Sequence, residues 1–130
     1  MRIGTMLSMP GDDTDTNGLI ERAQRAERAG LASVWLPQVF GVDALMVIAM
    51  AGRETSTIEL GTAVVPTYPR HPTVLASQAL TAQQASGGRL ALGIGLSHRF
   101  VVENDPRPRL LEADSAHARV PDDPQRIAGR

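Results

Sequence analysis

Residues 58–96 read IELGTAVVPTYPRHPTVLASQALTAQQASGGRLALGIGL and contain two strand-like segments separated by a helix-like one. The first segment, 58–65, ends at a proline, and the second, 90–96, alternates large aliphatic side chains with alanine and glycine. Between them a helix is predicted to begin at Pro72, because proline is favoured in a first helical turn, and to end at the glycine pair 87–88. A strand, a helix and a second strand in succession predict parallel pairing through a right-handed crossover.

The same alternation extends towards the N-terminus. Residues 2–7 and 32–36 are predicted strands, and the segment between them has apolar residues at helical spacing, with Asp15 or Asn17 as its N-cap. Together with a helical segment over 44–55, these elements give the order β-α-β-α-β-α-β. This order predicts an α/β fold with a parallel sheet.

The second predicted helix is apolar almost all round. It begins after Asp43, a good N-cap, runs to about Thr55, and contains the apolar stretch 44–51. A helix of this composition is buried on more than one side. It is either a deep core helix or a subunit interface, and the second alternative predicts a homo-oligomer formed through residues 44–51.

The composition excludes several kinds of chemistry. The 130 residues include 13 basic side chains, all of them arginine, against 14 acidic ones, so the net charge is −1. The lack of lysine excludes Schiff-base chemistry, and the lack of cysteine excludes disulfides, thiolate nucleophiles and cysteine-bound metals. The near-neutral balance predicts no nucleic-acid partner, and the three histidines are too scattered along the chain to predict a metal site.

Two further features concern location and domain organisation. The first residues lack the apolar run of a secretory signal, and the most apolar stretch, 43–52, is about half of the roughly 20 residues that span a bilayer. A cytoplasmic protein with no membrane partner is therefore expected. Residues 1–100 carry the alternating pattern and are predicted to form the domain. Residues 101–130 are rich in proline, arginine and aspartate and are predicted to be a mostly disordered tail.

Short motifs between residues 58 and 96, together with one earlier segment, carry a family resemblance. The motifs are Leu60-Gly-Thr-Ala-Val-Val-Pro66, Arg70-His-Pro72, Ser86-Gly-Gly-Arg89, Leu92-Gly-Ile-Gly95 and the segment 29–38, AGLASVWLPQ. Together they resemble the bacterial-luciferase-like family of flavin- and deazaflavin-dependent oxidoreductases, and within it they are more similar to the coenzyme F-420 branch. The resemblance covers roughly residues 1–100.

The resemblance implies a (β/α)8 TIM barrel with the cofactor at the C-terminal ends of the strands, which is where such barrels place their sites. It implies coenzyme F-420, a deazaflavin, as cofactor, with FMN as the alternative, and a small-molecule substrate. It also implies a non-prolyl cis peptide between Ala63 and Val64, next to Thr62, behind the middle ring of the cofactor. Ser97 and His98, after the fourth strand, would face the same opening.

One position departs from the family pattern. Many deazaflavin relatives carry an acidic residue followed by histidine after the second strand, where this chain has Gln38 and Val39. A glutamine amide can hydrogen-bond the edge of a flavin ring, but it cannot act as a general acid or base. The sequence therefore assigns Gln38 to cofactor binding and leaves the catalytic residues unknown.

Other conspicuous residues have simpler interpretations. Gly93-Ile-Gly95 lacks the third glycine of a dinucleotide-binding fingerprint, so tight packing or close approach of a flavin is predicted there. His71 and Arg89 are predicted to be structural, the first at a helix start and the second at the N-terminal end of a strand. Tyr68, in the loop after the third strand, is a candidate for the wall of a ligand site.

The length of the chain conflicts with a complete barrel. A closed (β/α)8 barrel has roughly 250 residues, about twice the present number, and four strands make only its N-terminal half. A truncated family member is therefore expected. Two functions are compatible with this expectation. One is a flavin- or deazaflavin-dependent oxidoreductase that transfers hydride or activates oxygen. The other is a non-catalytic half-barrel that acts only by association with another chain.

Overall fold

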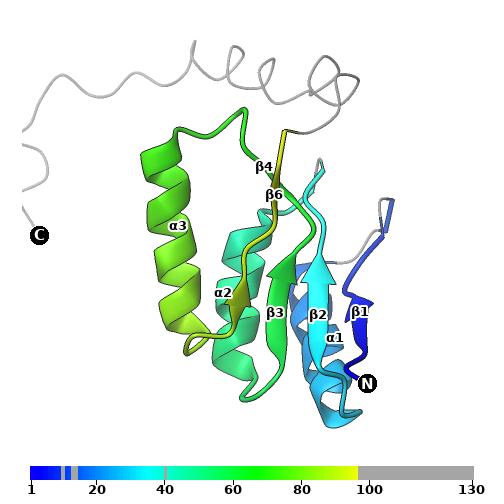
Figure 1. Ribbon diagram of the computed structural model, residues 1–130. Helices are drawn as coiled ribbons and strands as arrows, with labels where there is room; N and C mark the ends of the chain where they lie inside the picture. Colours follow the sequence, from blue (N-terminus) through cyan, green and yellow to red (C-terminus); the bar gives the residue numbers. More distant parts are fainter. Residues whose placement is uncertain (10, 13–14, 40, 97–130) are drawn as a thin grey trace, which may run out of the picture. The chain divides into compact units, whose positions relative to one another are not determined.

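The computed structural model describes residues 1–9, 11–12, 15–39 and 41–96, so the predicted tail, 101–130, lies outside the described residues (Figure 1). Within these described residues, three helices lie between short strands, six in number. In order they are β1 (Gly4–Met6), α1 (Thr16–Arg28), β2 (Ser33–Leu36), α2 (Ala44–Glu54), β3 (Glu59–Thr62), β4 (Val65–Pro66), α3 (Pro72–Ala85), β5 (Leu90–Ala91) and β6 (Ile94–Gly95).

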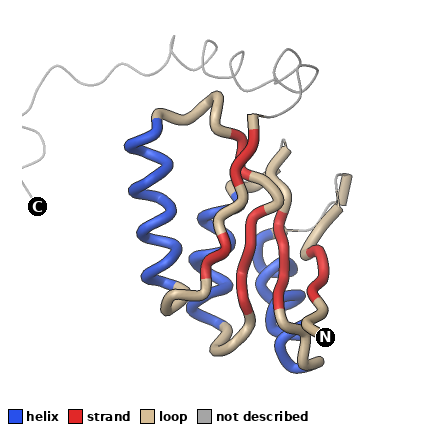
Figure 2. The backbone as a smooth tube through the Cα atoms, in the orientation of Figure 1, coloured by secondary structure: helices blue, strands red, loops and turns tan. Residues whose placement is uncertain are grey.

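The strands form two parallel arrangements. The larger sheet has the order β1-β2-β3-β5, and β4 pairs with β6 beyond it. The register places Leu36 beside Thr62 and Leu60 beside Leu90, with every pair parallel. Figure 2 shows α1 and α2 behind the strands, with α3 following beside α2. This arrangement confirms the predicted α/β class and is that of the N-terminal half of a (β/α)8 barrel.

Side-chain caps fix where the helices begin. The Oδ1 atom of Asp15 accepts a hydrogen bond of 2.7 Å from the Gly18 amide, and Oδ1 of Asp43 accepts one of 3.1 Å from the Met46 amide. His71 caps α3 in the same way, through Nδ1, and Pro72 follows in the first turn. The two aspartate caps contribute about 1 kcal/mol each. The predicted structural role of His71 is thereby confirmed.

The hydrophobic core lies between the sheet and the helices, and α2 runs through its middle. Most of the circumference of α2 is buried, which accounts for its apolar composition, while Met46 and Met50 stay exposed. The core interpretation of this helix is therefore confirmed for most of its surface. The largest fully buried apolar side chains are Leu7, Leu19, Val34, Leu36, Leu45, Val47, Ile48, Ile58, Leu60 and Val65.

The third and fourth predicted strands are each divided, where the sequence predicted continuous ones. At the break, a side chain takes the place of part of the backbone ladder. The Oγ1 hydroxyl of Thr62 donates to the carbonyl oxygen of Gly93 at 2.8 Å and accepts from the Gly93 amide at 2.9 Å. Regular pairing between β3 and β5 stops before this bridge, and parallel pairing resumes beyond it between β4 and β6.

The glycines of the fourth predicted strand allow this close approach. A β-carbon on Gly93 would overlap the carbonyl oxygen of Thr62, and one on Gly95 would lie 2.8 Å from Cγ2 of Val64. Real β-carbons do not come so close to their neighbours. Of the two predicted reasons for these glycines, tight packing is therefore present in the structure.

Arg89 joins the C-terminal end of α2 to the start of β5. Its guanidinium donates four hydrogen bonds, at 2.7–3.0 Å, to the carbonyl oxygens of Gly52, Thr55 and Ile58 and to the Thr55 hydroxyl. The last carbonyls of a helix have no partner within the helix, so the arginine supplies one. This confirms the structural role predicted from its position.

Glu27, near the end of α1, binds the turn that precedes β3. Its Oε1 atom accepts hydrogen bonds from the amides of Ser56, Thr57 and Ile58 at 2.6–3.0 Å and from the Thr57 hydroxyl at 3.1 Å. Partial burial raises the pKa of Glu27, but these four bonds to the ionised form outweigh it and lower the pKa from 4.5 to about 2. The charged carboxylate therefore stabilises the fold.

The Glu27→Gln variant is expected to lose about 1–2 kcal/mol of unfolding free energy at pH 7, a figure reduced for the partial exposure of the carboxylate. Because the folded pKa is the lower one, the stabilisation is complete above pH 4.5 and is lost as the pH falls towards 2. Urea unfolding at pH 7, 4 and 3 measures this. The difference between wild type and E27Q should shrink with acid, and Glu21→Gln, on the exposed side of α1, is the control. A difference independent of pH would contradict the assignment.

Candidate functional site

The candidate site lies at the C-terminal end of the strands. Parallel strands all end at the same edge of a sheet, so the segments after β2 and β3 come together there. The backbone shows this directly, because the Ala63 amide donates a hydrogen bond of 2.9 Å to the carbonyl oxygen of Leu36. Gln38, two residues after β2, and Thr62, Ala63 and Val64, at the end of β3, therefore belong to one region.

Ala63 and Val64 form an exposed apolar surface, which we call the apolar ledge. Both residues are exposed, Val64 to 42%, and the peptide bond between them is cis, as the family resemblance predicted. The ledge is held on both sides, since the Ala63 amide binds Leu36 and the Val65 amide donates to Gly93 at 2.9 Å. It therefore presents aliphatic groups from a fixed backbone.

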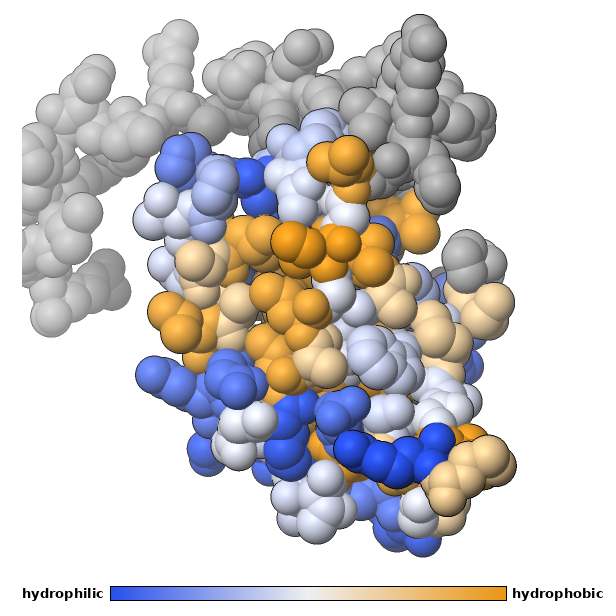
Figure 3. All heavy atoms as spheres, viewed as in Figure 1, coloured by the Kyte–Doolittle hydropathy of each residue, from blue (hydrophilic) through white to orange (hydrophobic). Residues whose placement is uncertain are grey.

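Further apolar side chains are exposed on the segment from β5 to just beyond β6, which pairs with the segment that carries the ledge. Leu92, Ile94 and Leu96 are all exposed, and Gly95 packs directly against Val64. Figure 3 shows apolar atoms gathered across the middle of this face. A shallow groove of about 400 Å³ lies beside them, lined by Thr67, Arg70, Pro72, Leu75, Ala76, Leu92 and Ile94.

Thr62 fixes the backbone that precedes the ledge. Its side chain is 1% exposed, and its hydroxyl both donates to and accepts from Gly93. A hydroxyl used in this way has little capacity left for a ligand. The predicted cofactor contact of Thr62 stays a prediction, and what the structure adds is its role in fixing the backbone before Ala63.

Gln38 is buried, with 8% of its surface exposed, and its side-chain amide is oriented by two donors. Its Oε1 atom accepts from the Ala44 amide at 3.1 Å and from Nη2 of Arg70 at 3.3 Å. Two donors converging on one atom identify it as the oxygen. Within the described part of the chain, Nε2 of Gln38 makes no hydrogen bond, so its N–H groups have no partner there.

Arg70 and Asp43 complete the region, and sequence reasoning missed their connection. The two side chains form an ion pair, with the Arg70 side chain only 10% exposed. Arg70 also donates to the Pro66 carbonyl and to Oε1 of Gln78, both at 3.3 Å. The sequence offered one signal, an arginine between two prolines in a short loop. Its partner, 27 residues away, already had a role as a helix cap.

The other predicted site residues are placed as follows. Ser97 and His98 lie outside the described residues. Tyr68 is exposed in the loop after β4, and its role as a ligand wall stays a prediction. In the ranges that the structure describes, no group of three or more histidine, aspartate or glutamate side chains could hold a metal ion, and no helix is long and apolar enough to cross a membrane.

Comparison with known proteins identifies the family. Residues 1–122 match the model of the luciferase-like monooxygenase family. The chain belongs to this family. A Mycobacterium tuberculosis protein named as a coenzyme F-420-dependent oxidoreductase is 38% identical over 103 residues, covering 79% of this chain and 29% of that protein. The F-420-dependent glucose-6-phosphate dehydrogenase of Amycolatopsis mediterranei is 34% identical over 87 residues, covering 59% of this chain and 26% of the dehydrogenase.

Solved structures share the fold. The F-420-dependent tetrahydromethanopterin reductase of Methanopyrus kandleri superposes with a TM-score of 0.70 at 26% identity, covering 78% of this chain and 29% of the reductase. The oxygenating constituent of a diketocamphane monooxygenase from Pseudomonas putida superposes with a TM-score of 0.66 at 23% identity, covering 75% and 30%. The chain thus spans less than a third of the length of these proteins.

Proposed function

We propose that this chain binds the ring of a flavin-type cofactor, coenzyme F-420 or alternatively FMN, for an oxidoreductase that acts on a small organic substrate. The apolar ledge carries the proposal, because it is exposed at the C-terminal end of the strands and fixed by backbone hydrogen bonds. A flat ring system can place one face against such a surface. The relatives named as F-420-dependent support the deazaflavin.

The residues present fit the ring of such a cofactor. The ledge offers an apolar support for a ring face, and Nε2 of Gln38 offers a hydrogen-bond donor for an acceptor atom at the ring edge. When bound, the cofactor supplies hydride transfer or, with FMN, oxygen activation. Gln38 holds no transferable proton, so its role is to bind and orient. Ser97 and His98, which follow β6, are proposed as further contacts at the opening.

The Val64→Asp variant is expected to weaken binding of coenzyme F-420 and of FMN by about tenfold or more, because a carboxylate would have to be desolvated against the ring. Fluorescence titration of the purified chain with each cofactor measures this. Leu80→Asp on α3 is the control, since Leu80 is also an exposed aliphatic side chain (63%) but lies in the second half of a helix that leads away from the C-terminal end of the strands. Absence of binding by the wild-type chain at micromolar cofactor would contradict the proposal.

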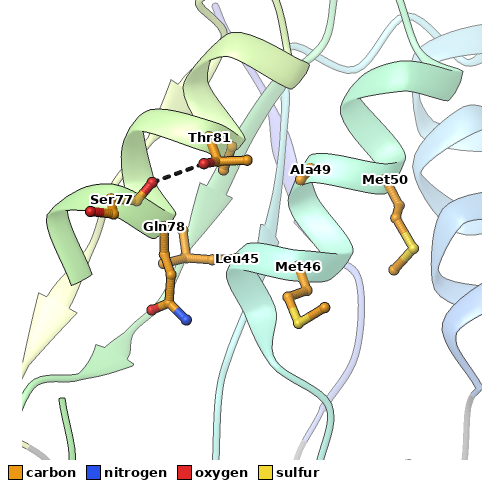
Figure 4. A pocket seen from close by; sticks show the side chains of 8 residues that line it. Leu45, Met46, Ala49, Met50, Ser77, Gln78 and Thr81 are labelled. Atoms are coloured by element: carbon orange, nitrogen blue, oxygen red, sulfur yellow. Dashed lines mark hydrogen bonds between the residues drawn. The ribbon is translucent and has the colours of Figure 1, made fainter. Parts of the chain in front are cut away.

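The second candidate function is association with another chain, and the groove between α2 and α3 favours it. This groove has a volume of about 450 Å³, and Figure 4 shows its lining side chains on facing turns of the two helices. Met46, which is 64% exposed, and Met50 extend from α2 beside it. We propose that the chain forms a homo-oligomer through the outer face of residues 44–51. Sedimentation velocity of the titration samples measures the oligomeric state, and a monomer at every concentration would contradict this second proposal.

A further inference from the structure

Arg70 is placed to control which atom of the Gln38 amide faces a ligand. Its guanidinium reaches four partners on separate segments: Gln38 after β2, Asp43 at the start of α2, the Pro66 carbonyl at the end of β4, and Gln78 on α3. The first three partners lie at the C-terminal end of the strands or just beyond it, and Gln78 lies in the second turn of α3. A planar guanidinium with five donors suits such a junction, whereas a lysine ammonium does not.

A glutamine side chain has two nearly isosteric ends. Rotation of the amide by half a turn exchanges the acceptor Oε1 for the donor Nε2. In this chain the Ala44 amide and Nη2 of Arg70 both donate to Oε1, at 3.1 and 3.3 Å. Either half-turn would bring N–H groups against these two donors. The amide is thus locked with Nε2 available.

The ion pair with Asp43 holds Arg70 in this position. Oδ2 of Asp43 accepts from Nη2 of Arg70, while Oδ1 caps α2 through the Met46 amide. Asp43 therefore links the guanidinium to the helix whose first amide also binds Gln38. The side chains of both partners are largely shielded from solvent, which strengthens their attraction.

We propose that Arg70 is a positioning residue for the cofactor ring: it fixes the Gln38 amide so that a donor, not an acceptor, is presented at the site. The inference rests on the proposed function. It also defines the ligand chemistry, because a fixed donor selects a ring-edge oxygen or nitrogen that accepts a hydrogen bond. Arg70 acts through Gln38 and is not itself assigned a contact with the ring.

A double-mutant cycle tests this proposal. The Gln38→Glu substitution keeps an oxygen for Ala44 and Arg70 but removes the N–H donor, so it erases what Arg70 is proposed to position. Arg70→Lys is expected to weaken FMN and coenzyme F-420 binding about fivefold to tenfold in the Gln38 chain, the effect of one lost hydrogen bond. In the Q38E chain, R70K is expected to have less than a twofold effect.

Asp43→Asn gives the same comparison should R70K not fold, because asparagine still caps a helix but leaves Arg70 without its counter-charge. A second readout needs no cofactor. The side-chain amide resonances of Gln38, recorded by ¹⁵N NMR on the free chain, are expected to shift and broaden in R70K and in D43N. The matched control is Arg53→Lys, on the exposed end of α2.

The outcomes separate this inference from the proposed function. If wild type binds neither cofactor, both the proposed function and this inference are overturned. If wild type binds but R70K lowers the affinity equally in the Gln38 and Q38E chains, Arg70 is merely structural and this inference alone is overturned. Unchanged Gln38 amide resonances in R70K and D43N would overturn it as well. Non-additive affinities together with altered resonances support it.

Discussion

Replacing Arg89 by methionine is expected to lower the free energy of unfolding by about 3–4 kcal/mol. Methionine retains the apolar stem of the side chain but removes all four hydrogen bonds that end on Gly52, Thr55 and Ile58. Thr55 is buried, so water cannot fully replace the lost donors. The cost is mainly that of leaving carbonyl oxygens without partners.

Urea unfolding at pH 7 measures this loss. Arg53→Met is the matched control, because Arg53 is exposed on the last turn of the same helix, where substitutions cost about 0.5 kcal/mol or less. Arg89→Lys should fall between the two, since one ammonium group cannot reach four acceptors. Equal stabilities of R89M and R53M would show that the guanidinium does not supply these carbonyls in solution.

The case of Arg89 shows how far sequence patterns reach. Its place between a glycine pair and a strand predicted a structural role, and the structure confirms it. The acceptors were beyond prediction, because they lie 31–37 residues earlier in the chain. Local sequence patterns predict helix starts such as those at Asp43 and Pro72 well, because the amide that the capping side chain binds is only two or three residues away.

The divided strands show the same limit. Residues 58–65 are mostly apolar or small and contain no proline, so a continuous strand was the natural prediction. The interruption arises where the hydroxyl of Thr62 bonds to Gly93, 31 residues further on. The small residues of the fourth predicted strand indicated that another group packs closely against this strand. They did not indicate that this group is the backbone of the neighbouring strand.

The candidate site was predicted in part for a related reason. The family resemblance placed the cis peptide at Ala63–Val64, and the structure has it there. It did not show that the Oε1 atom of Gln38 is taken up by the fold, because Arg70 and Ala44 meet it only once β2, α2 and β4 are assembled. The glutamine that stands in place of an acidic residue therefore also accepts structural hydrogen bonds, which the motif alone does not reveal.

Gly93→Ala is expected to cost about 3 kcal/mol of unfolding free energy, and to abolish the cofactor binding proposed above. The added β-carbon would overlap the carbonyl oxygen of Thr62. A backbone atom cannot turn aside as a side chain can, so β3 and the β5–β6 segment must separate. Separation breaks the two Thr62 hydroxyl bonds and the bond from the Val65 amide, which together hold the apolar ledge.

Gly41→Ala is the control for this variant, because a β-carbon on Gly41 would meet no atom within 4 Å. Urea unfolding measures the stability of both variants, and titration with FMN and coenzyme F-420 measures the site. A G93A chain that unfolds within about 0.5 kcal/mol of wild type would show that the Thr62–Gly93 contact yields easily. If G93A were destabilised yet bound cofactor with wild-type affinity, the ledge would not be the surface that holds the ring. Stability and binding should fall together because the same three hydrogen bonds sustain both.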